Sequence, residues 1–230
     1  MEHLEPQFGG LIGVTIKKNS NRFLSFLLSF ASGLMMSIIC FDLIPEAMEV
    51  GNITSIILGI LFGIIMMIIC DIKVEKKFNS DNTIAKNGLL KTGIVVSIGL
   101  AIHNFPEGLA IGSGFDASMK LGLSLAVAIC LHDIPEGISM AVPMKNGGMK
   151  ISKVIYYVII SGITTGVGAF FGAIIGTISN EVISICLSFA AGAMLYIVSG
   201  ELIPESNKLY SGRMSVIGNI IGFIIGMFTI

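Results

Sequence analysis

Long runs of apolar residues without a single charge alternate with short polar stretches along the chain, and they predict membrane-spanning helices. Five such runs are residues 23–41, 50–70, 154–180, 182–200 and 214–230. Each is close to or above the roughly 18 residues that cross a bilayer as a helix. Two further runs, 92–115 and 121–144, are equally long, but each contains a short polar motif. The hydropathy pattern therefore predicts seven spans.

An eighth apolar segment, FGGLIGVTI at residues 8–16, lies near the start of the chain. About ten helical residues rise only ~15 Å, against a hydrocarbon core of ~30 Å. We number it span 1 and expect it to be short or truncated. The predicted fold is an all-α integral membrane protein, a bundle of seven to eight transmembrane helices. We expect one domain over residues 1–230: spans 1–3 within 1–70, a polar loop at 71–88, spans 4–5 within 89–144 and spans 6–8 within 153–230.

The basic residues of the loops predict the orientation. Thirteen of the fourteen Lys and Arg residues follow odd-numbered spans, and only Lys120 follows an even-numbered one. Because basic loops stay in the cytoplasm, the loop 71–88 should be cytoplasmic and the C-terminus should lie outside the cell membrane. Charged residues make up 13% of the chain and its net charge is −1, so we expect a lipid bilayer around it and no nucleic-acid partner.

Two segments repeat each other at an offset of 159 residues. LSFASGLMMSIICFDLIPE at 28–46 and LSFAAGAMLYIVSGELIPE at 187–205 are identical at eleven of nineteen positions. They form spans 2 and 7, which cross the membrane in opposite directions because they are five spans apart. Inverted repeats of this kind are typical of secondary transporters, which bind their substrate near the membrane midplane.

The polar motifs within spans 4 and 5 are HNFPEG at 103–108 and HDIPEG at 132–137. Histidine and glutamate four residues apart share one helix face in each motif. An ionised residue at a helix centre costs ~3 kcal/mol of insertion free energy, so three carboxylates cost on the order of 8–10 kcal/mol. A bound divalent cation would offset this cost. Imidazole, carboxylate and amide donors suit Zn²⁺, Fe²⁺ or Mn²⁺. We therefore predict a metal site formed by His103, Asn104, Glu107, His132, Asp133 and Glu136.

These two motifs, together with eight spans and a long loop between spans 3 and 4, resemble the ZIP (Zrt/Irt-like) family of divalent metal transporters. The resemblance implies a 3+2+3 inverted arrangement of helices, a homodimer, and uptake of metal toward the cytoplasm. It also implies two adjacent sites. His103, Glu107, His132 and Glu136 would form the first, and Asn104 and Asp133 would join the same two glutamates in the second.

The chain departs from the family pattern at two positions. Some members have a glutamate on span 6 that completes the second site, where SGITTGVGA at 161–169 places Thr165. We therefore expect a weaker second site or a relay. On span 7, SGELIPE has Gly200 where some members have histidine, which leaves Glu201 as a candidate ligand along the path.

Four further acids lie near span ends. By the predicted topology, Asp42 and Glu46 lie near the outer surface, where they would collect cations, or else serve as ordinary interfacial acids. Glu201 and Glu205 lie near the cytoplasmic exit. Together with Thr165 these are candidate path residues.

The function that we predict is secondary transport of divalent transition metals into the cytoplasm, with Zn²⁺ as the first candidate and Fe²⁺, Mn²⁺ and Cd²⁺ as alternatives. The metal is the substrate, and we expect no cofactor. The chain contains no GxxxxGK[ST] phosphate loop for ATP hydrolysis. The alternative is an intramembrane zinc-dependent hydrolase, but no HExxH motif is present, and hydrolysis does not require an inverted repeat.

Overall fold

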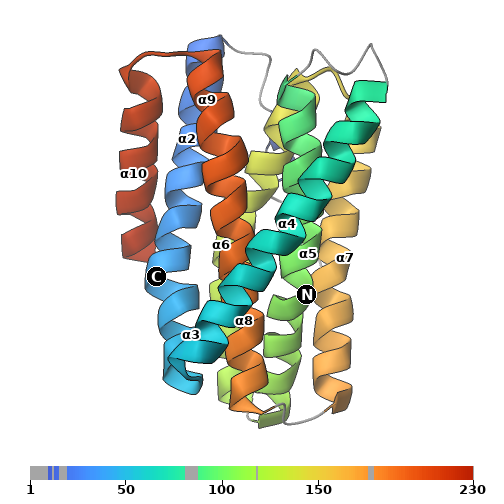
Figure 1. The fold of residues 1–230 in the computed structure, drawn as a ribbon, viewed down its shortest axis with the longest axis vertical. Coiled ribbons are helices and arrows are strands. Elements are labelled where there is room, and N and C mark those ends of the chain that lie inside the picture. The colour runs from blue at the N-terminus through green and yellow to red at the C-terminus, as the bar shows by residue number, and fades with distance from the viewer. Residues whose placement is uncertain are drawn as a thin grey trace.

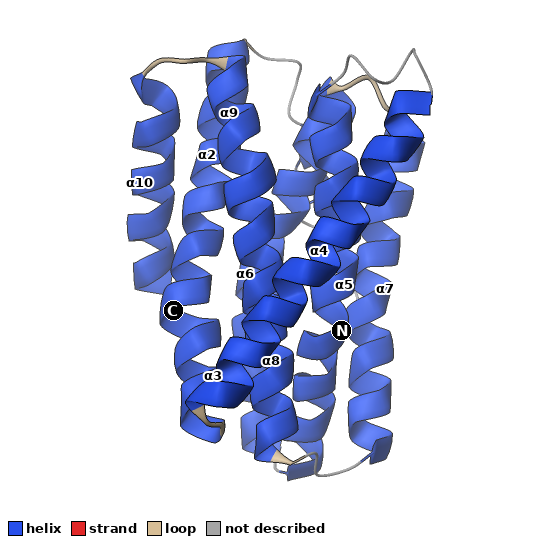
Figure 2. Ribbon diagram, viewed as in Figure 1, coloured by secondary structure: helices blue, strands red, loops and turns tan. Residues whose placement is uncertain are grey.

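The computed structural model describes residues 10–11, 13–15, 20–80, 88–117, 119–175 and 179–229. Within some helices it describes the backbone of a residue but not its side chain, as at His132. Every regular element in the described residues is a helix, as Figure 2 shows. The helices run roughly parallel to one long axis and form an upright bundle, which α4 crosses diagonally (Figure 1). The prediction of an all-α membrane bundle is confirmed.

Two long helical rods follow the internal repeat. The first is α2 (Asn21–Ile38), the π-helix η1 (Ile39–Leu43) and α3 (Ile44–Val50). The second is α8 (Asn180–Tyr196), the π-helix η2 (Ile197–Leu202) and α9 (Ile203–Leu209). Serine caps both starts, with the Ser20 and Ser179 hydroxyls accepting from Phe23 N and Val182 N. All these boundaries agree with the offset of 159 to within one residue.

The rods extend beyond the predicted ends of spans 2 and 7, residues 41 and 200. Pro45 and Pro204 have no N–H group to donate to the preceding turn, which would break a regular α-helix. In both rods the turn before the proline widens into a π-helix, and an α-helix resumes at Ile44 and at Ile203. The widened turn therefore accommodates the proline without ending the rod.

The helix α4 (Ile53–Ser80) corrects another predicted boundary. The segment expected to be a loop, 71–88, is helical as far as Ser80, and residues 81–87 lie outside the described part. Lysine and glutamate make up four of the seven residues 71–77, and their high helix propensity favours the continuation of the helix. The remaining helices are α5 (Gly88–Ala117), α6 (Met119–Asn146), α7 (Ile151–Ile175) and α10 (Arg213–Thr229).

The two repeats exchange their third helices. α4 packs against α8 of the other repeat, and α10 packs against α2. A Cβ atom built on Gly63 would lie 2.2 Å from the backbone oxygen of Phe189, and one on Gly222 would lie 2.1 Å from that of Phe30. These two contacts are related by the offset of 159. The close backbone approach that small residues permit between membrane helices therefore occurs twice, once in each half.

A third set of glycine contacts joins α5 to α7. A Cβ on Gly108 would lie 2.0 Å from the backbone oxygen of Thr165, and one on Gly112 would lie 2.1 Å from that of Ala169. On α7, a Cβ built on Gly168 would lie 2.2 Å from the backbone oxygen of Phe105 on α5. Gly108 is the last residue of the HNFPEG motif, so the motif's glycine brings α7 against the motif.

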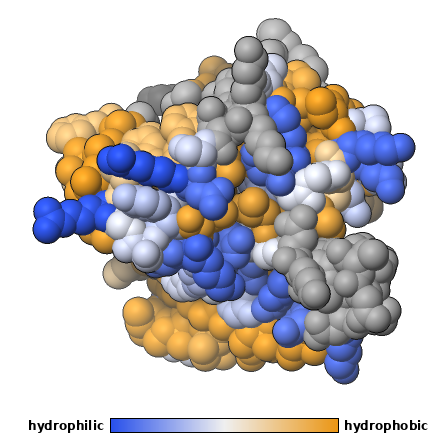
Figure 3. All heavy atoms as spheres, turned by 90° about the horizontal axis from the view of Figure 1, so that it is seen from above, coloured by the Kyte–Doolittle hydropathy of each residue, from blue (hydrophilic) through white to orange (hydrophobic). Residues whose placement is uncertain are grey.

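The outside of the bundle is apolar. Among the described residues, five helices are long and apolar enough to cross a membrane, and the shorter apolar helix 213–228 accompanies them. Exposed isoleucine and phenylalanine side chains cover α4, α7 and α10, for example Phe62, Phe170 and Phe228. Seen end-on, hydrophilic side chains cross the middle of one end face while hydrophobic ones form its flanks (Figure 3).

Only part of the predicted span 1 is described. Residues Gly10, Leu11 and 13–15 are helical. A Cβ on Gly10 would meet the Val158 side chain of α7, and one on Gly13 would meet Ala141 of α6. This segment therefore lies against α6 and α7, and the rest of the predicted span lies outside the described residues.

We expect Gly63→Ala and Gly222→Ala each to destabilise the protein by about 1–3 kcal/mol, because the new methyl group would overlap a backbone atom of the neighbouring helix. Thermal unfolding in detergent measures this. Gly200→Ala is the control, since its Cβ would lie 3.6 Å from the nearest atom, on Tyr196. Equal melting temperatures for Gly63→Ala and Gly200→Ala would contradict the close contact.

Candidate metal site

The two motifs lie halfway along two helices that contact each other, α5 and α6. His103, Asn104 and Glu107 lie on α5, and Asp133 and Glu136 lie on α6. All five side chains are buried, with 3% or less of their surface exposed. These five residues of the predicted metal site therefore lie at the middle of the bundle, away from both ends.

Among the described side chains, a direct contact of His103 with Glu136 joins the two motifs. His103 Nε2 lies 3.3 Å from Glu136 Oε2, across the interface of α5 and α6. Since the ring nitrogen and the carboxylate are both metal donors, an ion at this position could bridge the two helices. Glu136 Oε1 is buried and makes no hydrogen bond, so the carboxylate keeps one oxygen for another partner.

Asn104 is oriented by the neighbouring helix α7. Its amide nitrogen donates to the backbone oxygen of Ser161 at 3.3 Å. Its carbonyl oxygen Oδ1 is buried and has no hydrogen-bond partner. Native proteins rarely leave such an atom unpaired, because its desolvation is not compensated. The side chain of Asn104 is thus held at its donor end, while its acceptor end is available to a cation.

The described side chains do not form a complete coordination sphere. No group of three His, Cys, Asp or Glu among them is placed to hold a metal ion together. The side chain of His132, the second predicted histidine, lies outside the described ones. The described donors are the pair His103–Glu136 and the carbonyl of Asn104, with Glu107 and Asp133 buried nearby on the same helices.

Thr165 lies on α7, where its backbone oxygen faces Gly108 of the first motif. Its side chain is 8% exposed, and its hydroxyl oxygen Oγ1 is buried without a hydrogen-bond partner. The structure therefore brings Thr165 next to the motif on α5.

The four acids near span ends lie at opposite ends of the bundle. Asp42 and Glu46 are on η1 and α3, at the bottom of Figure 1, and Glu201 and Glu205 are on η2 and α9, toward its top. Asp42 and Glu46 are half-buried, whereas Glu201 and Glu205 are each 6% exposed. Glu205 has an ion pair with Lys208 at 3.7 Å.

Glu201 already has two partners, which the sequence analysis missed. Thr92 Oγ1 donates to Glu201 Oε2 at 2.9 Å, and Lys91 Nζ lies 3.5 Å from Glu201 Oε1. Lys91 also pairs with Asp71 at 3.0 Å. The sequence positions of Asp71 and Lys91 gave little sign of this contact. Asp71 is at the edge of the expected loop, and Lys91 served only as one of the basic residues that predict the orientation.

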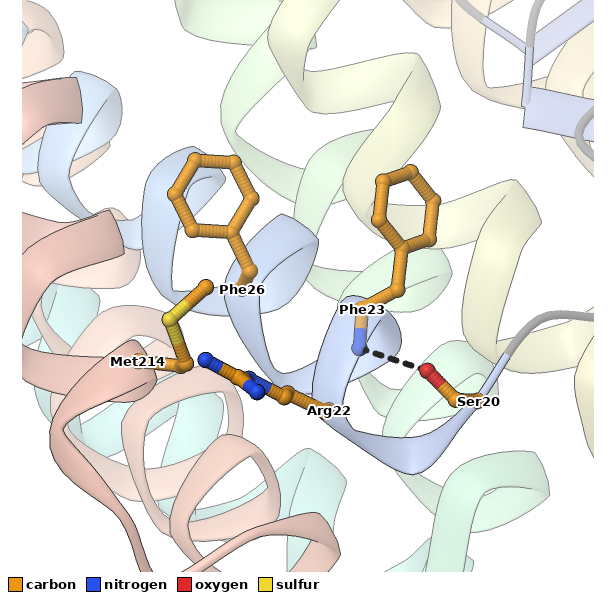
Figure 4. A pocket seen from close by; sticks show the side chains of 5 residues that line it. All are labelled: Ser20, Arg22, Phe23, Phe26 and Met214. Atoms are coloured by element: carbon orange, nitrogen blue, oxygen red, sulfur yellow. Dashed lines mark hydrogen bonds between the residues drawn. The ribbon is translucent and has the colours of Figure 1, made fainter.

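A surface hollow of about 340 Å³ lies elsewhere, at the start of α2 and α10. Its lining residues are Ser20, Arg22, Phe23, Phe26 and Met214, and Figure 4 shows the Ser20 hydroxyl capping Phe23 there. None of these five offers a carboxylate, an imidazole or a thiolate. The hollow is therefore not a candidate for the metal site.

We expect Thr165→Glu to strengthen metal binding, because it adds a carboxylate next to the motif on α5, whose side chains are already metal donors. Equilibrium dialysis with metal analysis should then give a higher bound Zn²⁺ content per chain than for the unsubstituted protein. Thr165→Gln, which has the same shape without the charge, is the control and should not raise it. An unchanged Zn²⁺ content in Thr165→Glu would place Thr165 outside the site.

Comparison with known proteins gives a consistent result. The family model described as ZIP Zinc transporter matches residues 72–230. A relative named zinc transporter ZupT, from Corynebacterium glutamicum, is 30% identical over 96% of this chain and 92% of its own length. ZupT from Streptococcus mutans is 32% identical over 96% of the chain and 90% of its length. Zinc transporter GufA from Myxococcus xanthus is 36% identical over 59% of the chain and 54% of its length.

The match to the family model includes both polar motifs and the second half of the inverted repeat, and the ZupT relatives align over nearly the whole chain. The helical bundle agrees with that assignment. The chain belongs to the ZIP zinc transporter family.

Proposed function

We propose that this protein is a secondary transporter that moves divalent transition-metal ions across the membrane into the cytoplasm, through a site between α5 and α6. The contact of His103 with Glu136, buried at the middle of the bundle, is the observation that carries the proposal. An uncompensated carboxylate at this depth is costly, and a divalent cation compensates it directly. The membership in the ZIP zinc transporter family supports the same conclusion.

Zn²⁺ is the substrate that we propose first. Imidazole nitrogen and carboxylate oxygen are its usual ligands together with thiolate, and the relatives named above are called zinc transporters. Fe²⁺, Mn²⁺ and Cd²⁺ remain alternatives, because selectivity between such ions depends on geometry more than on donor type. His103, Asn104, Glu107, His132, Asp133 and Glu136 are the ligands that we propose.

The inverted repeat supports alternating access to this site. Transporters with such repeats commonly expose a midplane site to each side in turn by moving one part of the bundle against the other. We propose that the ion enters past Asp42 and Glu46 and leaves past Glu201 and Glu205, which lie at opposite ends of the bundle. The intramembrane hydrolase alternative has no support among the named relatives, which are transporters.

The direction and the assembly are also part of the proposal. The basic residues Lys91, Lys208 and Arg213 lie at one end of the bundle, together with the start of α2, and this end would face the cytoplasm. The C-terminus and the α5–α6 connection would then face outward. We also propose a homodimer in the cell membrane, as the family resemblance implies.

Metal uptake into proteoliposomes that contain a fluorescent chelator tests the function. We expect the unsubstituted protein to admit Zn²⁺, and Glu107→Ala/Glu136→Ala to lose at least about 90% of the rate, because both buried carboxylates are gone. Glu49→Ala, at an exposed position on α3, is the control and should keep its rate. Purified protein that binds Zn²⁺ but admits none would exclude the transporter.

Labelling of single cysteines tests the orientation in cells. In a background without the four native cysteines, Met119→Cys should react with a membrane-impermeant thiol reagent in intact cells. Ser211→Cys, in the exposed turn between α9 and α10, should react only after permeabilisation. The reverse pattern would show that the basic end of the bundle faces outward.

A further inference from the structure

Lys91, near the start of α5, joins two carboxylates from two other helices. Its Nζ atom lies 3.0 Å from Asp71 Oδ1 on α4 and 3.5 Å from Glu201 Oε1 on η2. Each carboxylate has a further partner. Thr92 donates to Glu201 Oε2 at 2.9 Å, and the Tyr196 hydroxyl donates to Asp71 Oδ2 at 2.8 Å. One ammonium group thus stands between two carboxylates whose other oxygens are already held.

This arrangement is largely withdrawn from water. The side chain of Glu201 is 7% exposed, that of Asp71 is 17% and that of Lys91 is 29%. An exposed ion pair contributes little, but a buried carboxylate that loses its cation keeps its full desolvation cost. Glu75, one turn beyond Asp71 on α4 and exposed, adds a further negative charge on the same side. Lys91 is thus the base that the structure shows paired with both carboxylates.

The position of the ammonium group relates it to the proposed path. Lys91 precedes His103 by twelve residues on the same helix, which is roughly 18 Å along α5. A metal ion that moves from the motifs toward this end of the bundle reaches Glu201, the proposed exit ligand. Glu201 already has a cation partner, so an ion that binds there competes with Lys91 Nζ for the carboxylate.

We propose that Lys91 is the exchangeable counter-cation of Glu201. Its ammonium group leaves the carboxylate when a divalent ion passes and returns to it afterwards. This inference rests on the proposed transport function. A carrier that has released its ion must change conformation again before the next cycle, and Glu201 is then a buried carboxylate that needs a positive charge. Lys91 supplies this charge from within the chain, with Asp71 as its second partner while Glu201 binds the ion.

The alternative is a static ion pair that braces α4, α5 and η2. The two roles differ in which transport mode they affect. Loss of a brace slows every mode, because the bundle itself is weakened. Loss of a counter-cation slows net uptake, which requires the return of the unloaded carrier. It spares metal-for-metal exchange, in which the carrier returns with an ion bound.

The experiment compares net ⁶⁵Zn²⁺ uptake into empty proteoliposomes with exchange into proteoliposomes preloaded with unlabelled Zn²⁺. We expect Lys91→Gln to lower the ratio of net uptake to exchange about tenfold. Lys73→Gln, which removes an exposed lysine two residues beyond Asp71, should leave the ratio unchanged. Lys91→Arg, which keeps the charge, should retain most of the ratio.

A double substitution separates charge compensation from other effects. In Glu201→Gln there is no carboxylate to compensate, so adding Lys91→Gln should not lower the ratio further. An unchanged ratio in Lys91→Gln overturns the proposal, and so does the loss of net uptake and exchange together. If the unsubstituted protein shows neither mode, the transport function itself fails, which is a different result from an unchanged ratio.

Discussion

Carboxylates buried in an apolar bundle require positive charge, and this requirement organises the molecule. Glu107, Asp133 and Glu136 are nearly fully buried at the centre of a helical bundle whose outer surface is covered by isoleucine and phenylalanine. No arrangement of neutral helices compensates such groups well. A divalent ion can do so at the motifs, and a lysine does so at the end of the same helix. The carboxylates of the motifs can therefore be compensated by the transported ion, whereas Glu201 is compensated by a lysine of the chain itself.

The requirement can be met only if the helices approach closely enough to share a cation. Among the described glycines, this approach occurs between α4 and α8, between α2 and α10, between α5 and α7, and also between α5 and α6, where a Cβ on Gly93 would lie 2.7 Å from the backbone nitrogen of Met144. The first two contacts are copies of each other at the offset of 159, so the two halves of the chain use the same packing in opposite orientations. The third places Thr165 and the Asn104 partner Ser161 beside the first motif.

Much of this could be predicted from the sequence. Hydropathy alone indicated helical spans, because the period and length of apolar runs are direct consequences of the bilayer. The repeat around LIPE predicted two related rods, and the spacing of His103 and Glu107 predicted a shared helix face. The site itself could be predicted only as a list of donors. Which pair meets depends on helix rotation, which a single sequence does not encode in any local pattern.

The ends of elements were less predictable, for physical reasons. The rods run past Phe41 and Gly200 because a π-turn accommodates each proline, and a proline in a sequence does not reveal how its turn will adjust. The segment 71–80 reads as polar, yet it is helical, since polarity reports contact with water and not the end of a helix. The contact of Lys91 with Asp71 and Glu201 joins residues 20 and 110 positions apart in the chain, so no local signal announces it.

The interlocked glycines also limit how the bundle can divide when it rearranges. Helices whose backbones touch along several turns resist sliding past each other, since any shift drives a Cα or a carbonyl into its neighbour. The pairs α5–α7, α2–α10 and α4–α8 should therefore each move as one body. The contacts of α5 with α8 and of α2 with α6 have no such interlock among the described glycines. The bundle can therefore open at these two contacts, and Lys91 lies at one end of the contact between α5 and α8.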